Sequence, residues 1–171
     1  IIFKIQRYLI TIQSIMKKIQ IIFFIFFLGF IAIRCTTTQS QKEKDIAIIQ
    51  EYIASQGLTD VQNSTTGLHY KIIDGGSGLR PAESSIITIK YHGHLVDGTQ
   101  FDTSDSLPDQ VLKTRLSSLI YGLREGLPKI LSGGKIKLLV PSSLGYGDSS
   151  LDKIPANSVL IFDVDLLKVE I

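Results

Sequence analysis

The chain has 171 residues, enough for one globular domain with extensions, and its hydrophobic share of 44% is ordinary for a protein with a packed core. Its net charge of +2 is unevenly distributed: residues 1–40 hold five basic and no acidic side chains, so the remaining 131 carry 13 basic and 16 acidic ones, a net −3. Because no basic patch with interleaved aromatics is present, we expect no nucleic-acid partner.

Residues 1–35 have the pattern of an export leader. Lys17 and Lys18 precede an uncharged apolar run over residues 19–33, and a polar stretch follows. The run is 15 residues long, whereas a membrane-spanning helix needs about 20. We therefore prefer targeting to a membrane span. Met16 is the only methionine, so we expect translation to start there and residues 1–15 to be upstream read-through.

Cys35 is the only cysteine, which excludes an intramolecular disulfide. Its position directly after the apolar run resembles the lipid-attachment cysteine of bacterial lipoproteins, which implies an exported protein anchored in the membrane of the cell envelope. Arg34 departs from that pattern, where a small residue ordinarily stands. An uncleaved signal anchor and an incidental cysteine are the alternatives to lipidation.

Residues 36–63 are expected to form a polar tether and an amphipathic helix ahead of the main domain. The tether is residues 36–44. The helical spacing that follows places Asp45 as the N-cap and Gly57 as the stop, with an apolar face made by Ile46, Ile49, Ile53 and Ala54. Packing or spacing is the expected role of this helix, and a dimer contact is the alternative.

Residues 64–171 have the pattern of a separate α+β domain. Alternating or β-branched runs predict strands over 68–73, 85–96, 135–141 and 158–170, and Asp97-Gly98 predicts a hairpin turn into the segment Thr99–Asp102. The only helical candidate among them is 119–127, which Pro128 ends. We expect an antiparallel sheet with this short helix on one face and solvent on the other.

The pair His92 and His94 raises the question of a metal site, because both side chains share one face of a strand. A zinc site needs three or four ligands. The only other histidine is His69, and no acid stands at a matching spacing. We therefore expect no metal, and we interpret these histidines as residues of a solvated strand face.

A set of aromatic residues and one acid stands close to glycines. Tyr91 lies on the strand face opposite His92, and Tyr146 lies between Gly145 and Gly147 in a loop. The other members are Phe101, Asp102 and Phe162. Composition alone leaves two interpretations open, ordinary core residues or the lining of a site.

Four ordered segments favour the second interpretation. The runs "YHGHLVDGTQFDTS", "LIYGLREGL", "GGKIKLLVPSSLGYG" and "IPANSVLIFDVDLLKVE" resemble FKBP-type peptidyl-prolyl cis-trans isomerases in order and in spacing. The resemblance covers residues 64–171, and the preceding helix resembles the N-terminal extension of exported bacterial members. It implies a strongly bent antiparallel sheet wrapped around a short helix, with an apolar pocket between them.

The resemblance also implies site residues. Five positions match catalytic residues of the family: Tyr91, Phe101, Asp102, Tyr146 and Phe162. Four more match substrate-binding positions: Leu119, Ile120, Leu123 and Ile154. Leu123 stands where the family usually has a tryptophan at the pocket floor, and Leu112 and Val111 are the nearest apolar substitutes for phenylalanines that the family often has in the segment 105–115.

The expected activity is isomerisation of X-Pro bonds in exported proteins as they fold. It requires no cofactor, because no covalent bond is made. The implied partners are proline-containing peptide segments, a macrolide ligand, and a membrane through the N-terminal anchor. The alternative is a catalytically weak module that binds proline-containing segments, an interpretation that Leu123 favours.

Overall fold

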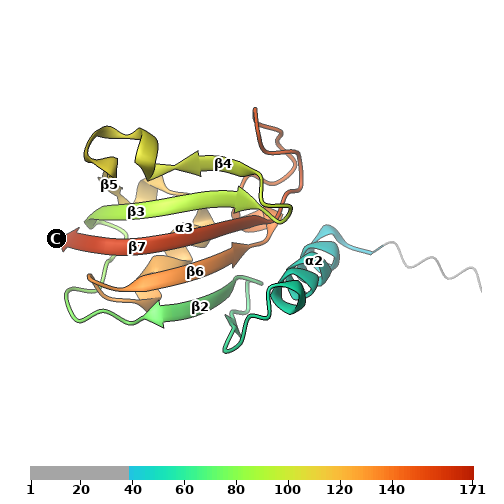
Figure 1. Cartoon of the computed structure of the whole chain (residues 1–171), viewed down its shortest axis with the longest axis horizontal. Helices are drawn as coiled ribbons and strands as arrows, with labels where there is room; N and C mark the ends of the chain where they lie inside the picture. The colour runs from blue at the N-terminus through green and yellow to red at the C-terminus, as the bar shows by residue number, and fades with distance from the viewer. Residues whose placement is uncertain (1–38) are drawn as a thin grey trace, which may run out of the picture. The chain divides into compact units, whose positions relative to one another are not determined.

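A computed structural model describes residues 39–171 of the chain, so the leader, the segment 1–15 and Cys35 lie outside the described residues. The described part is a bent antiparallel sheet with one short helix behind it and a second helix at one end (Figure 1). The helices are α2 (Gln41–Ser55) and α3 (Tyr121–Gly126). The strands are β1 (Gln62–Asn63), β2 (His69–Asp74), β3 (Ile86–Leu95), β4 (Gln100–Thr103), β5 (Leu112–Arg115), β6 (Lys135–Val140) and β7 (Leu160–Glu170).

The sheet order is β1-β2-β6-β7-β3-β4, and β5 also pairs with β3. The central strands β3 and β7 pair from Ile86↔Glu170 to Leu95↔Leu160, with a register shift between Thr88 and Ile89. On its other edge β3 pairs first with β5 and then with β4. One strand thus serves two short partners in succession, and β3, β4 and β5 all contribute residues to the pocket described below.

The inner face of the sheet forms the main core with α3. Alternate residues of β3 and β7 point inward, as the period of two predicts. The helix lies close to β6 because it presents glycines there: a Cβ on Gly122 would collide with Val140, and one on Gly126 would lie 2.6 Å from a methyl carbon of Leu138. The predicted strands, the helix and the α+β class are therefore confirmed.

The outer face of the sheet was predicted to face solvent, but part of it is covered by α2. Ile49 of α2 is fully buried against Leu139, Val159 and Ile161. The helix therefore covers one end of the outer face and adds a second, smaller apolar cluster to the domain.

The predicted start of this helix was also wrong. Ser40 is the N-cap, and its hydroxyl accepts a hydrogen bond from the Glu43 N–H while the Glu43 carboxylate accepts one from the Ser40 N–H. Residues 41–44, which were predicted to be part of the polar tether, therefore belong to the helix. The helix ends at Ser55, and Gly57 follows with a φ of +59°, so the predicted stop is confirmed. Within residues 39–171, no helix is both long enough and apolar enough to cross a membrane.

The three histidines do not come together. His92 and His94 lie on the strand face opposite Tyr91, and the ring nitrogens of His69 lie within hydrogen-bond distance of other residues. His92 is exposed. His94 is partly covered by Tyr52 of α2 and lies 3.5 Å from the Asp163 carboxylate, so it is less solvated than predicted. His69 is buried, with Nδ1 3.0 Å from the Gly67 carbonyl and Nε2 3.2 Å from the Gln50 amide. In the described range no group of three His, Cys, Asp or Glu side chains could hold a metal ion.

Candidate active site

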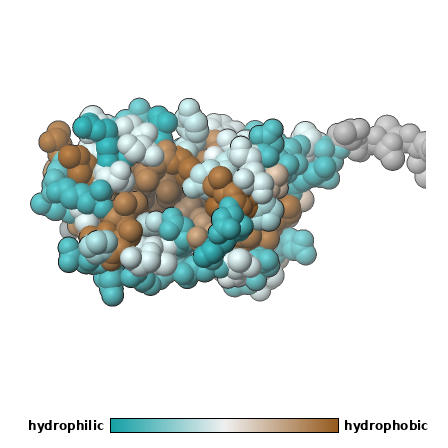
Figure 2. Space-filling view, turned by 90° about the horizontal axis from the view of Figure 1, so that it is seen from above, coloured by the Kyte–Doolittle hydropathy of each residue, from teal (hydrophilic) through white to brown (hydrophobic). Residues whose placement is uncertain are grey.

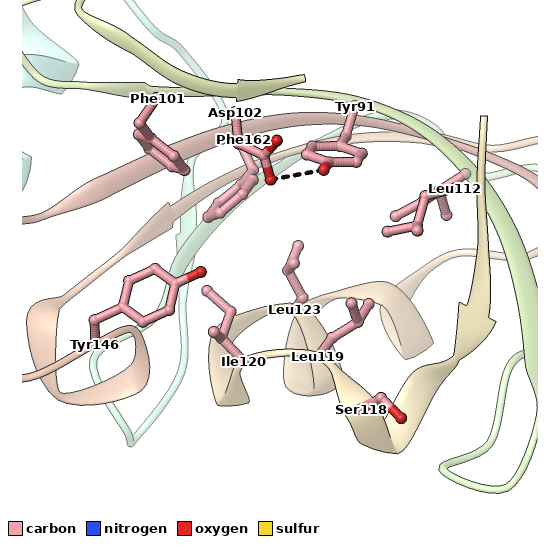
Figure 3. A pocket seen from close by; sticks show the side chains of 11 residues that line it. Tyr91, Phe101, Asp102, Leu112, Ser118, Leu119, Ile120, Leu123, Tyr146 and Phe162 are labelled. Carbon is pink, nitrogen blue, oxygen red and sulfur yellow. Dashed lines mark hydrogen bonds between the residues drawn. The ribbon is translucent and has the colours of Figure 1, made fainter. Parts of the chain in front are cut away.

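A cavity of about 250 Å³ lies between the inner face of the bent sheet and the segment that leads into α3 (Figure 3). Strands β3, β4, β5 and β7 provide one wall, and residues 118–123 provide the other. The cavity is lined by Ile89, Tyr91, Phe101, Asp102, Leu112, Ser118, Leu119, Ile120, Leu123, Tyr146 and Phe162. Seen from above the view of Figure 1, apolar surface gathers at the middle of the molecule and hydrophilic surface surrounds it (Figure 2).

The aromatic wall is held together by ring contacts. The Phe101 and Phe162 rings meet edge to face, with centroids 5.5 Å apart and planes at 82°. The Tyr91 and Phe162 rings are tilted at 46° with centroids 6.5 Å apart. Both geometries are favourable for aromatic pairs. The three rings therefore fix one another without a polar contact between them.

Gly93 makes this arrangement possible. It lies on β3 opposite Phe162 in the strand register, and its missing side chain leaves space for the phenylalanine rings. A Cβ at this position would lie 2.7 Å from two ring carbons of Phe101 and 3.1 Å from a ring carbon of Phe162. Close approach of an aromatic ring to the backbone thus requires glycine here.

The polar centre of the cavity is a bonded pair. The Tyr91 hydroxyl donates a hydrogen bond of 2.7 Å to Oδ2 of Asp102 (Figure 3). The other carboxylate oxygen accepts the Thr103 N–H at 2.8 Å. Burial, followed by this hydrogen bond and the charge of Asp102, raises the pKa of Tyr91 well above its usual value. Tyr91 therefore stays protonated and holds the carboxylate in one orientation.

The backbone at Tyr91 is fixed from the same hairpin. Its N–H donates to Oγ of the fully buried Ser104 at 3.1 Å. Its carbonyl accepts a hydrogen bond of 3.3 Å from the Thr103 hydroxyl. These two side-chain contacts continue the attachment of β3 to its partner beyond the regular strand pairing, so the tyrosine cannot swing away from the acid.

Tyr146 lies across the cavity from this pair, and its hydroxyl points inward (Figure 3). Among the described residues it has no hydrogen-bond partner, and 38% of the residue is exposed. Burial and then the nearby charge of Asp102 raise its pKa. The phenol is therefore a protonated donor at neutral pH, available to a ligand carbonyl.

A second, more open cavity of about 320 Å³ shares Phe101, Asp102 and Tyr146 with the first. Its far side is the turn from Leu151 to Ile154. Within that turn the Ile154 N–H donates a hydrogen bond of 3.2 Å to the Leu151 carbonyl, and the Leu151 N–H donates one of 2.9 Å to the Ile154 carbonyl. A chain that lies in the first cavity can thus continue into the second.

Comparison with known proteins identifies the fold. Residues 78–167, just over half of the chain, match the family described as FKBP-type peptidyl-prolyl cis-trans isomerase. The chain belongs to this family. It is 38% identical over 143 residues to the FKBP-type peptidyl-prolyl cis-trans isomerase FkpA of Escherichia coli, a match that covers 79% of the chain and 52% of that relative. The chain thus spans about half the length of this curated relative.

Solved structures agree with this assignment to the FKBP-type family. The crystal structure of FkpA from Escherichia coli aligns with a TM-score of 0.67 at 37% identity, over 84% of this chain and 70% of that one. A peptidyl-prolyl cis-trans isomerase from Pseudomonas syringae pv. tomato aligns with a TM-score of 0.63 at 26% identity, over 78% of this chain and 99% of that one. The predicted FKBP-like fold is confirmed.

The FKBP-type structure brings eight of the nine predicted site residues to the first cavity, while Ile154 lines the second. The three lining residues that were not assigned to the site are Ile89, Leu112 and Ser118. Ile89 could have been found, because it precedes Tyr91 by two positions and therefore shares its strand face. Ser118 carried no comparable signal.

Proposed function

We propose that the chain accelerates cis–trans isomerisation of X-Pro bonds in polypeptides that are folding. The observation that carries this proposal is the apolar cavity, closed by three contacting aromatic rings and containing one fixed carboxylate and one free phenol. Membership of the FKBP-type family supports it. The proposed substrates are segments that contain proline.

Isomerisation of an X-Pro bond requires no covalent catalysis by the protein. Rotation about an X-Pro bond breaks amide resonance, with a barrier of about 18–20 kcal/mol, and makes no covalent bond. The planar amide has more charge separation than the twisted one, so an environment that removes water from the amide favours the twisted state. This is preferential binding of the transition state. Each tenfold acceleration needs about 1.4 kcal/mol.

The proposed roles follow from the positions of the side chains. The proline ring lies against the apolar wall, which consists of Tyr91, Phe101, Ile120, Leu123 and Phe162. The free Tyr146 hydroxyl donates to a substrate carbonyl. Asp102, oriented by its hydrogen bond from Tyr91, faces the carbonyl that rotates. Leu119 extends the apolar wall, and Ile154 lines the path along which the substrate chain leaves.

The family resemblance also implies that the Ile154 N–H holds a substrate carbonyl, and this role needs an extra step. Its hydrogen bond to the Leu151 carbonyl, 3.2 Å long, must be exchanged before it can hold a substrate carbonyl. Tyr146 requires no such exchange. We therefore assign the main carbonyl contact to Tyr146.

The test is a peptide isomerisation assay on the full chain in mild detergent. Phe101→Ala, Asp102→Ala and Tyr146→Phe are expected to lower kcat/KM while remaining folded. Tyr70→Phe and Asp105→Ala are matched controls, because both residues lie outside the two cavities. Full activity in all three site variants would refute the proposed site.

A catalytically weak module that binds proline-containing segments is the second candidate function, favoured by Leu123 at the floor of the cavity. It predicts that the wild-type chain binds proline-containing peptides, and a macrolide in the same cavity, without accelerating isomerisation at high protein concentration. Peptide titration together with the rate assay separates the two functions. A measurable catalytic rate that the macrolide inhibits would exclude the weak module.

We further propose that the protein is exported and that Cys35 anchors it to a membrane of the cell envelope through a lipid. The support is the charge and hydropathy pattern of residues 16–35. Cys35→Ser is expected to abolish lipid labelling and to release the protein from membranes. Unchanged labelling and membrane association would refute the lipid anchor. Intact mass of the native precursor tests whether residues 1–15 are made.

A further inference from the structure

The helix α2 reaches the loop that carries Tyr146 through one buried carboxylate. Asp45 is fully buried, and its Oδ2 accepts two hydrogen bonds from Ser142, one from the N–H at 2.8 Å and one from the hydroxyl at 2.6 Å. The two residues are 97 positions apart in the sequence. This is a contact between α2 and the segment that follows β6, far apart in the sequence but adjacent in the fold.

Ser142 passes the constraint to both sides of Tyr146. Its carbonyl accepts the N–H groups of Gly145 and Gly147, each at 2.9 Å. The Gly147 carbonyl in turn accepts the Asn157 N–H at 2.8 Å. Gly145 and Gly147, which flank Tyr146, are thus both hydrogen-bonded to Ser142. Ser142 is in turn held by the Asp45 carboxylate.

This contact is more than helix docking requires. The apolar face of α2 already packs on the sheet through Ile49, Leu139, Val159 and Ile161. Burying a carboxylate costs free energy unless it is fully hydrogen-bonded. Here Gln41, one turn earlier, donates to the remaining oxygen, Oδ1, at 2.7 Å, so the acid is satisfied and fixed in one orientation.

We propose that Asp45 is a positioning residue for Tyr146, so that α2 contributes to the geometry of the active site. The inference rests on the proposed isomerase function and names a residue that sets the geometry of its carbonyl donor. Asp45 touches no substrate; it acts through Ser142 and the two glycines. Loss of the carboxylate therefore leaves the cavity intact and lets the Tyr146 hydroxyl move.

The experiment is a double-mutant cycle on the full chain in mild detergent, with kcat and KM measured separately. Asp45→Ala is expected to lower kcat/KM about fivefold, the scale of one hydrogen bond. In a Tyr146→Phe background the same change is expected to have an effect of less than about twofold, because the group that it positions is gone. Asp45→Asn keeps an oxygen acceptor and is expected to retain most of the wild-type kcat/KM.

Ile53→Ala is the matched control, because it weakens the apolar packing of the same helix without touching the carboxylate. It is expected to lower the melting temperature and leave kcat/KM unchanged. If Asp45→Ala fails to fold, Ser142→Ala, which removes only the hydroxyl donor, takes its place in the cycle. Equal losses in both backgrounds, or an Ile53→Ala loss as large as that of Asp45→Ala, would overturn the proposal.

Failure of the proposed function is distinguishable from failure of this inference. An inactive wild-type chain refutes the isomerase function. Amide hydrogen exchange at Gly145 and Gly147 then reads the positioning directly, without activity. We expect it to be faster in Asp45→Ala and near the wild-type rate in Asp45→Asn and Ile53→Ala. Unchanged exchange in Asp45→Ala would refute the positioning role.

Discussion

Tyr91 and Asp102 form a single hydrogen-bonded unit, 2.7 Å between hydroxyl and carboxylate, on the wall of an otherwise apolar cavity. The tyrosine is only 8% exposed, and the acid gains its orientation from it. Neither side chain is independent, so a change at one is expected to alter the behaviour of the other.

Tyr91→Phe is expected to lower both stability and activity. The carboxylate loses its hydroxyl donor, which costs about 1 kcal/mol of unfolding free energy, and it becomes free to turn. A drop in kcat/KM similar to that of Asp102→Asn, with no further loss in the double variant, would show that the pair acts as a unit. Tyr70→Phe controls for loss of a hydroxyl elsewhere. Additive losses would contradict the unit.

Alkaline pH is expected to destabilise the fold through three tyrosines. Burial raises the pKa of Tyr52, Tyr91 and Tyr146 above the usual 10.0. The folded state then binds more protons than the unfolded state above pH 10, so their contribution is complete below pH 10 and is lost as pH rises. The test is to measure the midpoint of urea unfolding at pH values from below 10 upward, and to follow ionisation of the tyrosines by phenolate absorbance. A wild-type decline no steeper than that of Tyr91→Phe would contradict it.

Gly93→Ala is expected to impair both activity and stability. The new methyl group would meet the Phe101 ring at 2.7 Å and push it from its edge-to-face contact with Phe162. Overpacking of this kind costs about 1–3 kcal/mol, and we expect at least a tenfold loss of kcat/KM because the wall of the cavity moves. Gly75→Ala is the control, since nothing lies within 4 Å of a Cβ there. Retained activity in Gly93→Ala would contradict the role of the ring.

Leu123→Trp is expected to strengthen ligand binding. Leu123 forms the floor of the cavity and is 6% exposed. A larger ring there adds roughly 50 Å² of apolar contact, about 1.3 kcal/mol, which corresponds to about tenfold tighter binding of a macrolide. Calorimetric titration checks this, with Leu123→Ala as the opposite change. Weaker binding by the tryptophan variant would show that the floor has no room for it.

The strands β2, β3, β6 and β7 were predictable because each has a clear local period. Ile87, Ile89 and Tyr91 alternate with polar residues along β3, and the Asp97-Gly98 turn sets the hairpin. The strand β5 was missed because four residues that include Lys113 and Arg115 carry no apolar alternation. Its place depends on pairing with β3, which is a tertiary property.

The helix start and the loop contact were missed for different reasons. The signal for Ser40 as N-cap was present, since Glu43 follows it by three positions and completes a capping box. The burial of Asp45 was not predictable, because an acid in the second turn of an amphipathic helix ordinarily faces solvent. Only the fold brings it to Ser142.

The position of β7 has a consequence for how the protein is made. The strand pairs with β6 on one side and with β3 on the other, and it alone joins the group β1-β2-β6 to the group β3-β4-β5. A nascent chain that ends before residue 160 therefore holds two half-sheets with no ladder between them, and it also lacks Phe162. The sheet cannot close until β7 is available, so complete folding of the domain is expected only after this strand has been synthesised.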